Sequence, residues 1–166
     1  VRALVRVSLF QVSYLRGLFP EEDFKPVKLD GLQGISVQML LPRGDDSKQM
    51  ISWVEHGISD ALSKNYLNTL IFGVSTDIDG TELLEVMSLT LLRSMLAQCA
   101  QSEVKSEVCK LMRTLVILCN TLNTMPDERY LFMKLSYIES TPEDYEPPGF
   151  RALEDVQGHF ISKPLS

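Results

Sequence analysis

The sequence predicts an α+β fold: a small antiparallel sheet of about three main strands with three helices packed on one face. Three separate stretches carry apolar residues at helical spacing. Two other stretches, late in the first half and near residue 130, have the apolar alternation of strands, and the first contains an Asp-Gly pair at its middle. Strands joined by a turn and separated by amphipathic helices are typical of an antiparallel sheet with helices on one side.

The first helix is expected at the start of the chain. It has an apolar stripe at helical spacing, formed by Val1, Leu4, Val5, Leu9, Val12 and Leu15. Gly17 and Pro20 follow and end it. Because the chain opens inside this periodic segment, we expect the natural N-terminal tail to be missing. A short apolar piece, "GISVQMLLP" (34–42), then predicts a minor strand.

A second helix is predicted over 47–66, "SKQMISWVEHGISDALSKNY". Three residues at its start are good N-cap candidates: Asp45, Asp46 and Ser47. Its expected buried stripe consists of Met50, Val54, Ile58, Ala61 and Leu62.

A β-hairpin is predicted next, because Asp79-Gly80 lies between two apolar stretches of about ten residues each. The stretch before the turn is apolar on both faces, with Leu70, Phe72 and Val74 on one and Leu67 and Ile71 on the other. A strand buried on both faces belongs in the centre of a sheet.

A long helix is predicted from Ser102 to Leu122. Its inward positions are expected to be Val104, Val108, Leu111, Met112, Leu115, Val116, Cys119 and Leu122. Residues 92–101 between the hairpin and this helix contain no Gly, Pro or Asp. Since a strand rarely passes into a helix without a turn residue, residues of a loop could be skipped here.

The last strand is predicted over Tyr130, Leu131, Phe132, Met133, Lys134, Leu135, Ser136, Tyr137 and Ile138. By alternation, the inward face is expected to carry Leu131, Met133, Leu135 and Tyr137, so that Phe132 on the outer face should tolerate truncation better than Leu135. The strand is expected beside the central strand, with its outer edge open. An exposed edge with a single Lys and no Pro is either covered or available for an added peptide strand. The alternative is an edge covered by the chain's own tail. The segment that follows directly cannot pair, since Pro142, Pro147 and Pro148 lack the N–H donor.

Composition and motifs exclude several functions. A chain of 166 residues fits one domain. A net charge of -6 argues against direct nucleic-acid binding, which needs clustered Lys and Arg. The three Cys, Cys99, Cys109 and Cys119, have no spacing of a zinc site or disulfide framework. Without a nucleophile elbow, a phosphate loop or a metal-ligand cluster, we expect no enzyme, cofactor or metal, and no stretch is long enough to span a membrane.

Four segments carry a resemblance to a known family: "YLRGLFPEEDF", "DALSKNYLNTLIFGV", "RTLVILCNTLNTMPDERYLFMKLSYI" and "TPEDYEPPGF". Together they resemble a meiotic HORMA domain, of the type found in the asynaptic chromosome axis proteins of plants and algae. The likeness covers nearly all of 1–166, which is expected to be a single HORMA domain. "TPEDYEPPGF" after an apolar strand is the most specific part, because it separates the meiotic branch from the other branches.

The resemblance implies a binding module that traps a closure-motif peptide as an added strand along Tyr130–Ile138. The peptide would come from axis proteins or from the protein's own C-terminus. A seat belt, beginning within 139–166, would then wrap over it. The lead-out of this belt would contain Thr141, Pro142, Tyr145, Pro147, Pro148 and Phe150. Of its side chains, Phe150 is the one expected to dock on the body of the domain.

The family also implies partners and a location. An AAA+ remodelling ATPase with a HORMA adaptor would reopen the clasp, and contact with chromatin would be indirect. The module would act in the nucleus, on the meiotic chromosome axis, in recombination and synapsis. Because the chain ends at "HFISKPLS", the resemblance implies that the final belt strands of the family are absent from it. A checkpoint-type HORMA regulator and a direct chromatin-binding domain are the alternatives.

Overall fold

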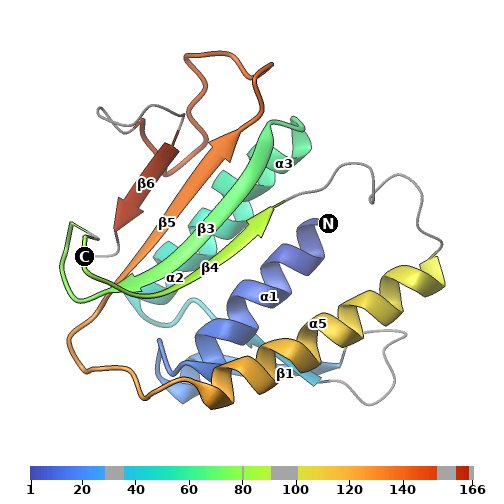
Figure 1. The fold of residues 1–166 in the computed structure, drawn as a ribbon, viewed down its shortest axis with the longest axis vertical. Coiled ribbons are helices and arrows are strands. Elements are labelled where there is room, and N and C mark those ends of the chain that lie inside the picture. Colours follow the sequence, from blue (N-terminus) through green and yellow to red (C-terminus); the bar gives the residue numbers. More distant parts are fainter. Residues whose placement is uncertain (29–35, 80, 91–100, 153–159, 165–166) are drawn as a thin grey trace. The chain divides into compact units, whose positions relative to one another are not determined.

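The computed structural model describes the backbone of residues 1–28, 36–79, 81–90, 101–152 and 160–164 (Figure 1). The chain forms two compact units. The first contains Val1–Lys48 and Arg93–Met125, and the second contains Gln49–Leu92 and Pro126–Ser166. The predicted loop irregularity at 92–101 lies almost entirely outside the described residues.

The first unit begins with α1 (Arg2–Leu15), which confirms the first predicted helix. Gly17 follows with φ +59, a conformation that favours glycine and ends the helix. The buried surface is wider than the predicted stripe and comprises Val5, Val7, Ser8, Leu9, Phe10, Gln11, Val12 and Ser13, whereas Val1 is 46% exposed. Two buried polar groups are satisfied, because the Ser13 hydroxyl donates to the Leu9 carbonyl and Gln11 Oε1 accepts the Gln38 N–H.

A short 3₁₀ helix, η1 (Glu21–Asp23), leads into a two-stranded antiparallel sheet of β1 (Phe24–Lys28) and β2 (Ser36–Leu40). The minor strand predicted within 34–42 is therefore confirmed as β2. Its partner β1 was not predicted, because Pro26 lies in the middle of it. Pro26 pairs with Gln38 in a sheet of only two strands. Both strands of such a sheet are edge strands, where proline is tolerated.

The long helix of the first unit, α5 (Gln101–Thr121), begins and ends within one residue of the prediction. Met112, Leu115 and Cys119 are buried as expected. Val116 and Leu122 are 37% and 46% exposed, so their predicted inward positions are wrong. Val116 lies about 100° around the helix from Leu115, and Leu122 follows the helix end.

Arg16, directly after α1, reaches the C-terminal end of α5. Its guanidinium donates to the carbonyls of Cys119 and Asn123. The two carbonyls lie at or just after the C-terminal end of α5, where a basic side chain is favourable. Arg16 therefore connects the C-terminal ends of α1 and α5.

The second predicted helix consists of α2 (Asp45–Ser52), η2 (Trp53–Ile58) and α3 (Ser59–Ser63), which follow one another without a break. It begins two residues earlier than predicted, and Gly44 precedes its first residue. Ser47 Oγ accepts the Gly44 N–H at 2.9 Å, so Ser47 satisfies this group from inside the first turn. The middle part, η2, is a π-helix, which the sequence did not predict.

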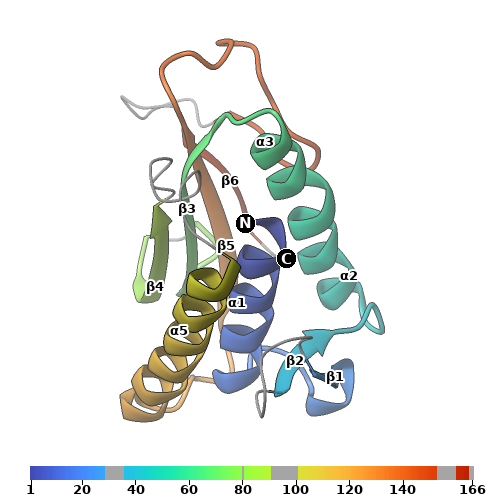
Figure 2. The same ribbon diagram turned by 90° about the vertical axis from the view of Figure 1, so that its right-hand side faces the viewer.

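The sheet of the second unit has the order β4-β3-β5-β6, formed by β3 (Leu67–Ser75), β4 (Leu83–Thr90), β5 (Tyr130–Tyr137) and β6 (Phe160–Pro164). The hairpin and the central place of β3 are confirmed. Three main strands were expected, and β6 makes a fourth. Figure 2 shows the sheet from its side, with α3 lying along one face. Of the three helices expected on one face, the second belongs to the same unit as the sheet from Gln49 onward.

The connection of the hairpin spans 76–82 and is longer than the expected two-residue turn. Gly80 lies outside the described residues. The Asp77 carboxylate accepts the N–H groups of Thr81 and Glu82 at 3.0 and 2.7 Å. The Thr81 hydroxyl donates to the same carboxylate at 2.7 Å. This hydrogen bond and the two backbone ones lower the pKa of Asp77, as expected of an aspartate that orders a loop.

Candidate functional site

The candidate site is β5, which lies between β3 and β6. Its core-facing row is the predicted one, since Leu131, Met133 and Leu135 are 5%, 0% and 0% exposed. Successive side chains of a strand point to opposite faces. The residues between them therefore belong to the other face: Phe132, Lys134 and Ser136.

The outer edge of β5 is occupied by β6, so the expectation of an open edge is wrong. The five residues of β6 run antiparallel to β5, from Phe160 opposite Ser136 to Pro164 opposite Phe132. The alternative, an edge covered by the chain's own tail, is confirmed. The prolines of the tail do not prevent this pairing. Three of them lie before β6 in the sequence, and the fourth is its last residue.

The ends of the predicted edge have other partners. Tyr130, Leu131 and Tyr137 lie beyond the β6 register but pair with β3. Ile138 follows the strand, and its N–H donates to the Tyr66 carbonyl at 2.9 Å. The part of the edge that β6 contacts is thus Phe132–Ser136.

Phe132 lies on the outer face of the sheet and is nevertheless only 4% exposed. It is paired with Gly73 of β3. A Cβ added to Gly73 would lie 2.2 Å from the tip of the Phe132 ring, which shows that the ring covers the glycine. The outward residue Phe132, expected to tolerate truncation, is therefore a packed residue.

The lead-out after β5 is held by its own turns. The N–H groups of Thr141, Tyr145 and Phe150 donate to the carbonyls of Ile138, Pro142 and Pro147, respectively. None of these hydrogen bonds belongs to a sheet ladder, which agrees with a proline-rich segment that cannot pair. Pro142 and Pro148 are exposed, whereas Pro147 is among the most buried residues.

Tyr145 anchors the first half of the lead-out. Its ring packs edge-to-face against Tyr66 and Tyr137, with centroids 4.9 and 5.2 Å away. Its hydroxyl donates to Asp60 on α3 at 2.7 Å, and Lys64 pairs with the same carboxylate at 2.8 Å. Burial raises the pKa of Tyr145, and its hydrogen bond to the Asp60 carboxylate raises it further. Hydrogen bonds from Lys64 and Tyr145 lower the pKa of Asp60 below its usual 3.8.

Replacing Tyr145 with phenylalanine should therefore change both stability and its pH dependence. The lost hydrogen bond should cost about 1 kcal/mol in unfolding free energy at neutral pH. Because the pKa of Asp60 is depressed on folding, its contribution is complete above pH 3.8 and is lost as the pH falls through the lower folded value. Tyr145→Phe should reduce this acid-induced loss in urea unfolding measured between pH 7 and pH 3.

Tyr66→Phe is the matched control, because it keeps an aromatic ring in the cluster and leaves the Tyr145–Asp60 hydrogen bond in place. Its acid profile should match that of the parent chain. Equal profiles for Tyr145→Phe and the parent would show that this hydrogen bond does not stabilise the lead-out.

Phe150 anchors the second half of the lead-out and is 6% exposed. Its ring lies against the π-helical turn, where a Cβ on Gly57 would be 2.3 Å from the ring. The Trp53 ring flanks it at a centroid distance of 6.2 Å, and Trp53 is 0% exposed. Gly149, with φ +81, adopts a conformation that glycine tolerates best and turns the chain just before Phe150. Phe150 thus docks on the body of its unit, in the place that only a glycine at position 57 leaves open.

Gly57 and Gly73 are the site residues that the sequence reasoning missed. Both are single glycines inside an element that the sequence predicts well. Such a glycine often marks the close approach of another group. Here both glycines make room for a phenylalanine ring, Phe150 at Gly57 and Phe132 at Gly73.

The described residues offer no second kind of site. No cluster of three or more His, Cys, Asp or Glu side chains in this part of the chain could hold a metal ion. None of its helices has the length and hydropathy that a membrane crossing requires.

The model of the HORMA domain family matches residues 1–164. The meiosis-specific protein ASY1 of Arabidopsis thaliana is 34% identical, over 96% of this chain and 31% of its own length. HORMA domain-containing protein 2 of Mus musculus is 31% identical, over 97% of this chain and 56% of its own length. This chain thus spans about a third to a half of these relatives.

A similar fold is found in C. elegans HTP-1, whose structure was solved bound to a HIM-3 closure motif. The TM-score is 0.77 at 17% sequence identity, over 95% of this chain and 75% of that one. At this identity the likeness concerns the fold alone. With the family model and two relatives above 30% identity, the chain belongs to the HORMA domain family.

Proposed function

We propose that this domain binds a closure-motif peptide as an added antiparallel strand on β5, and that it does so as a scaffold module of the meiotic chromosome axis. The observation that carries the proposal is the pairing of β6 with Phe132–Ser136. This antiparallel pairing over five residues supports the use of the same edge for an added strand. Main-chain hydrogen bonds of this kind form with many sequences, so a peptide from another chain could take the same place.

Binding of such a peptide requires β6 to leave the edge. The two anchors, Tyr145 and Phe150, divide the tail into a held part and a part that can exchange. Nine residues, 151–159, connect Phe150 to β6, enough to span at most ~30 Å when extended. In this proposal the seat belt begins to move after Phe150, and residues 139–150 stay on the body of the domain.

The biological setting follows from the family and from the relatives named for meiosis. The peptide would come from other axis proteins or from the protein's own C-terminal region. An AAA+ remodelling ATPase with its HORMA adaptor would return the clasp to its peptide-free form. The module would work in the nucleus on chromosome axes, with chromatin contacted through partners. The net charge of -6 supports an indirect contact with DNA.

The proposal is tested with a fluorescent peptide of residues 158–166, "GHFISKPLS", and the Ile161→Pro variant. Proline within β6 should break its pairing and vacate the edge, so the labelled peptide should bind this variant more tightly than the parent chain. Fluorescence anisotropy measures the affinity. The parent chain is the control, because its own β6 competes.

A series of peptides, each N-methylated at one residue, then reports the binding mode. In a strand added to an edge, alternate N–H groups point toward the neighbouring strand and the others point away. Methylation should therefore abolish binding at every second residue only. A uniform effect of methylation along the peptide would contradict strand addition. A separate binding assay tests the chromatin-binding alternative, which binding of double-stranded DNA by the domain at physiological salt would favour.

A further inference from the structure

Lys134 is the cationic residue at the centre of the β5 edge. In the register it has Ile71 of β3 on one side and position 162 of β6 on the other. It is half-buried, and its ammonium lies 5.4 Å from the centroid of the Phe132 ring. The ammonium is therefore held over an apolar neighbour at the edge where a strand is added.

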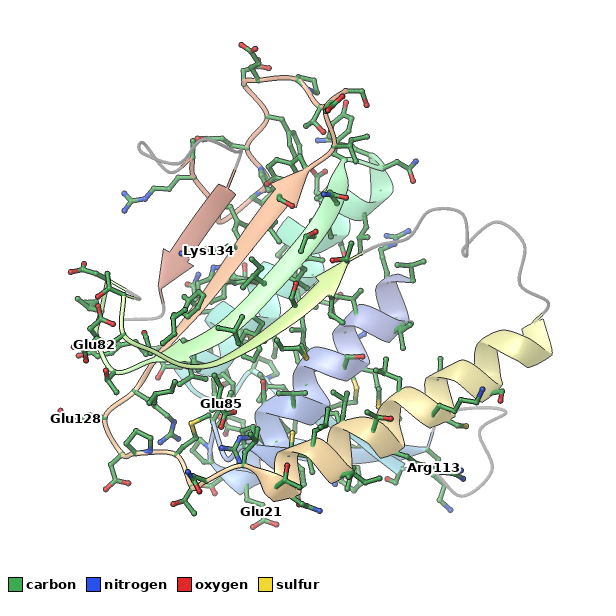
Figure 3. All side chains as sticks on the ribbon, viewed as in Figure 1. Glu21, Glu82, Glu85, Arg113, Glu128 and Lys134 are labelled. Carbon is green, nitrogen blue, oxygen red and sulfur yellow. The ribbon has the colours of Figure 1, made fainter. Side chains whose placement is uncertain are left out.

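No carboxylate in the described part of the chain pairs with Lys134. Figure 3 shows Lys134 beside β6, whereas the labelled Glu82 and Glu85 lie toward the loop that joins β3 and β4. On the remaining side, the position opposite Lys134 in β6 is Ser162, which is neutral. An Asp or Glu at the position opposite Lys134, on a strand bound to this edge, would therefore pair with its positive charge.

We propose that Lys134 is a specificity-determining residue, which selects strands with an Asp or Glu at the position opposite it. This inference rests on the proposed function. Residues directly opposite in an antiparallel pair have Cβ atoms about 4.5–5.5 Å apart, within reach of a Lys–Glu ion pair. The partly apolar surroundings reduce the screening of this pair by water.

The preference is specific to one register. The domain carries a net charge of -6, which repels acidic peptides in general. An acidic residue is favoured opposite Lys134, and a shift by one residue would place it on the other face of the sheet. Lys134 therefore selects both the peptide and its alignment. The chain's own strand lacks the acid, so an acidic peptide has an advantage over β6 in occupying the edge.

The inference is tested first within the chain, where no peptide ligand is needed. Ser162→Glu should slow hydrogen exchange of the β6 amides and Ser162→Lys should accelerate it, with a difference of about fivefold between them. In the Lys134→Met background, which keeps the length of the side chain without its charge, this difference should shrink to less than about twofold. An equal difference in both backgrounds would overturn the inference.

The second test uses the labelled peptide of residues 158–166 with Glu or Lys at the position of Ser162, and the Ile161→Pro variant. The Glu peptide should bind about fivefold more tightly than the Lys peptide, and Lys134→Met should remove the difference. If both peptides bind equally well, the charge selection is wrong while strand addition stands. If neither binds although the exchange experiment shows the charge effect, the proposed binding of peptides is wrong.

Discussion

Gly57→Ala should expel the Phe150 ring from the π-helical turn and release the second half of the lead-out. The new methyl group would lie 2.3 and 2.7 Å from two atoms of the ring and 2.8 Å from the Pro148 carbonyl oxygen. Rotation of the ring alone cannot relieve this, because the carbonyl belongs to the backbone. Forcing an extra methyl into a packed site costs about 1–3 kcal/mol, partly offset by the better helix propensity of alanine, about 1 kcal/mol.

The free energy of global unfolding should therefore change little, whereas the packing around Phe150 should change strongly. Trp53 is the single tryptophan of the chain and is fully buried beside Phe150. Its fluorescence emission should shift to longer wavelength in Gly57→Ala. The Phe150 amide, which donates to the Pro147 carbonyl, should exchange at least tenfold faster, which corresponds to about 1.4 kcal/mol.

Two variants control this experiment. Gly44→Ala introduces the same methyl group where the nearest atom is 3.7 Å away, so it should leave the emission of Trp53 and the exchange of the Phe150 amide unchanged. Phe150→Ala removes the ring, so adding Gly57→Ala to it should have little further effect. If Gly57→Ala behaved like Gly44→Ala, Phe150 would not be the anchor.

Phe132→Ala should destabilise the domain by about 3–5 kcal/mol, in the range of Leu135→Ala on the core-facing row. Position on the outer face alone would predict a small cost. The structure leads to the opposite expectation, because the ring is 4% exposed and covers Gly73. Its removal would expose the backbone of the central strand and leave a cavity beside it.

The matched control is Lys134→Ala on the same face of the same strand. This residue is half-buried, and its truncation should cost less than about 1 kcal/mol. Urea unfolding followed by circular dichroism gives both values. Similar small costs for the two variants would mean that Phe132 does not depend on Gly73 for its packing.

The sequence alone indicated that β3 is a central strand and that the lead-out does not pair with the sheet. Apolar residues on both faces of 67–74 require burial on both sides, and that requirement is local to the strand. Prolines that lack an N–H donor exclude 142–148 from a ladder whatever surrounds them. Phe150 was predicted as an anchor because few large apolar residues of the tail could dock. These inferences hold because each depends on a property of the residues themselves.

The pairing of β6 could not be decided in the same way. A stretch of five residues ending in proline has little strand signal of its own. Its pairing depends on the edge of β5 being within reach after a connection of more than twenty residues, from Ile138 to His159. Contacts between residues far apart in sequence are a property of the tertiary structure.

The sequence by itself determined the order of the elements other than β1 and β6, the core row of β5 and the family resemblance, because periodicity, proline chemistry and motif content are local. Only the tertiary structure decided which side chains pack against Gly57 and Gly73, why Phe132 is buried on the outer face, and which strand pairs with the edge of β5. The physical reason is that a glycine inside a helix or strand indicates that another group comes close to the backbone, but it does not identify the side chain that does so. That side chain comes from a distant part of the chain, and only the folded backbone brings the two together.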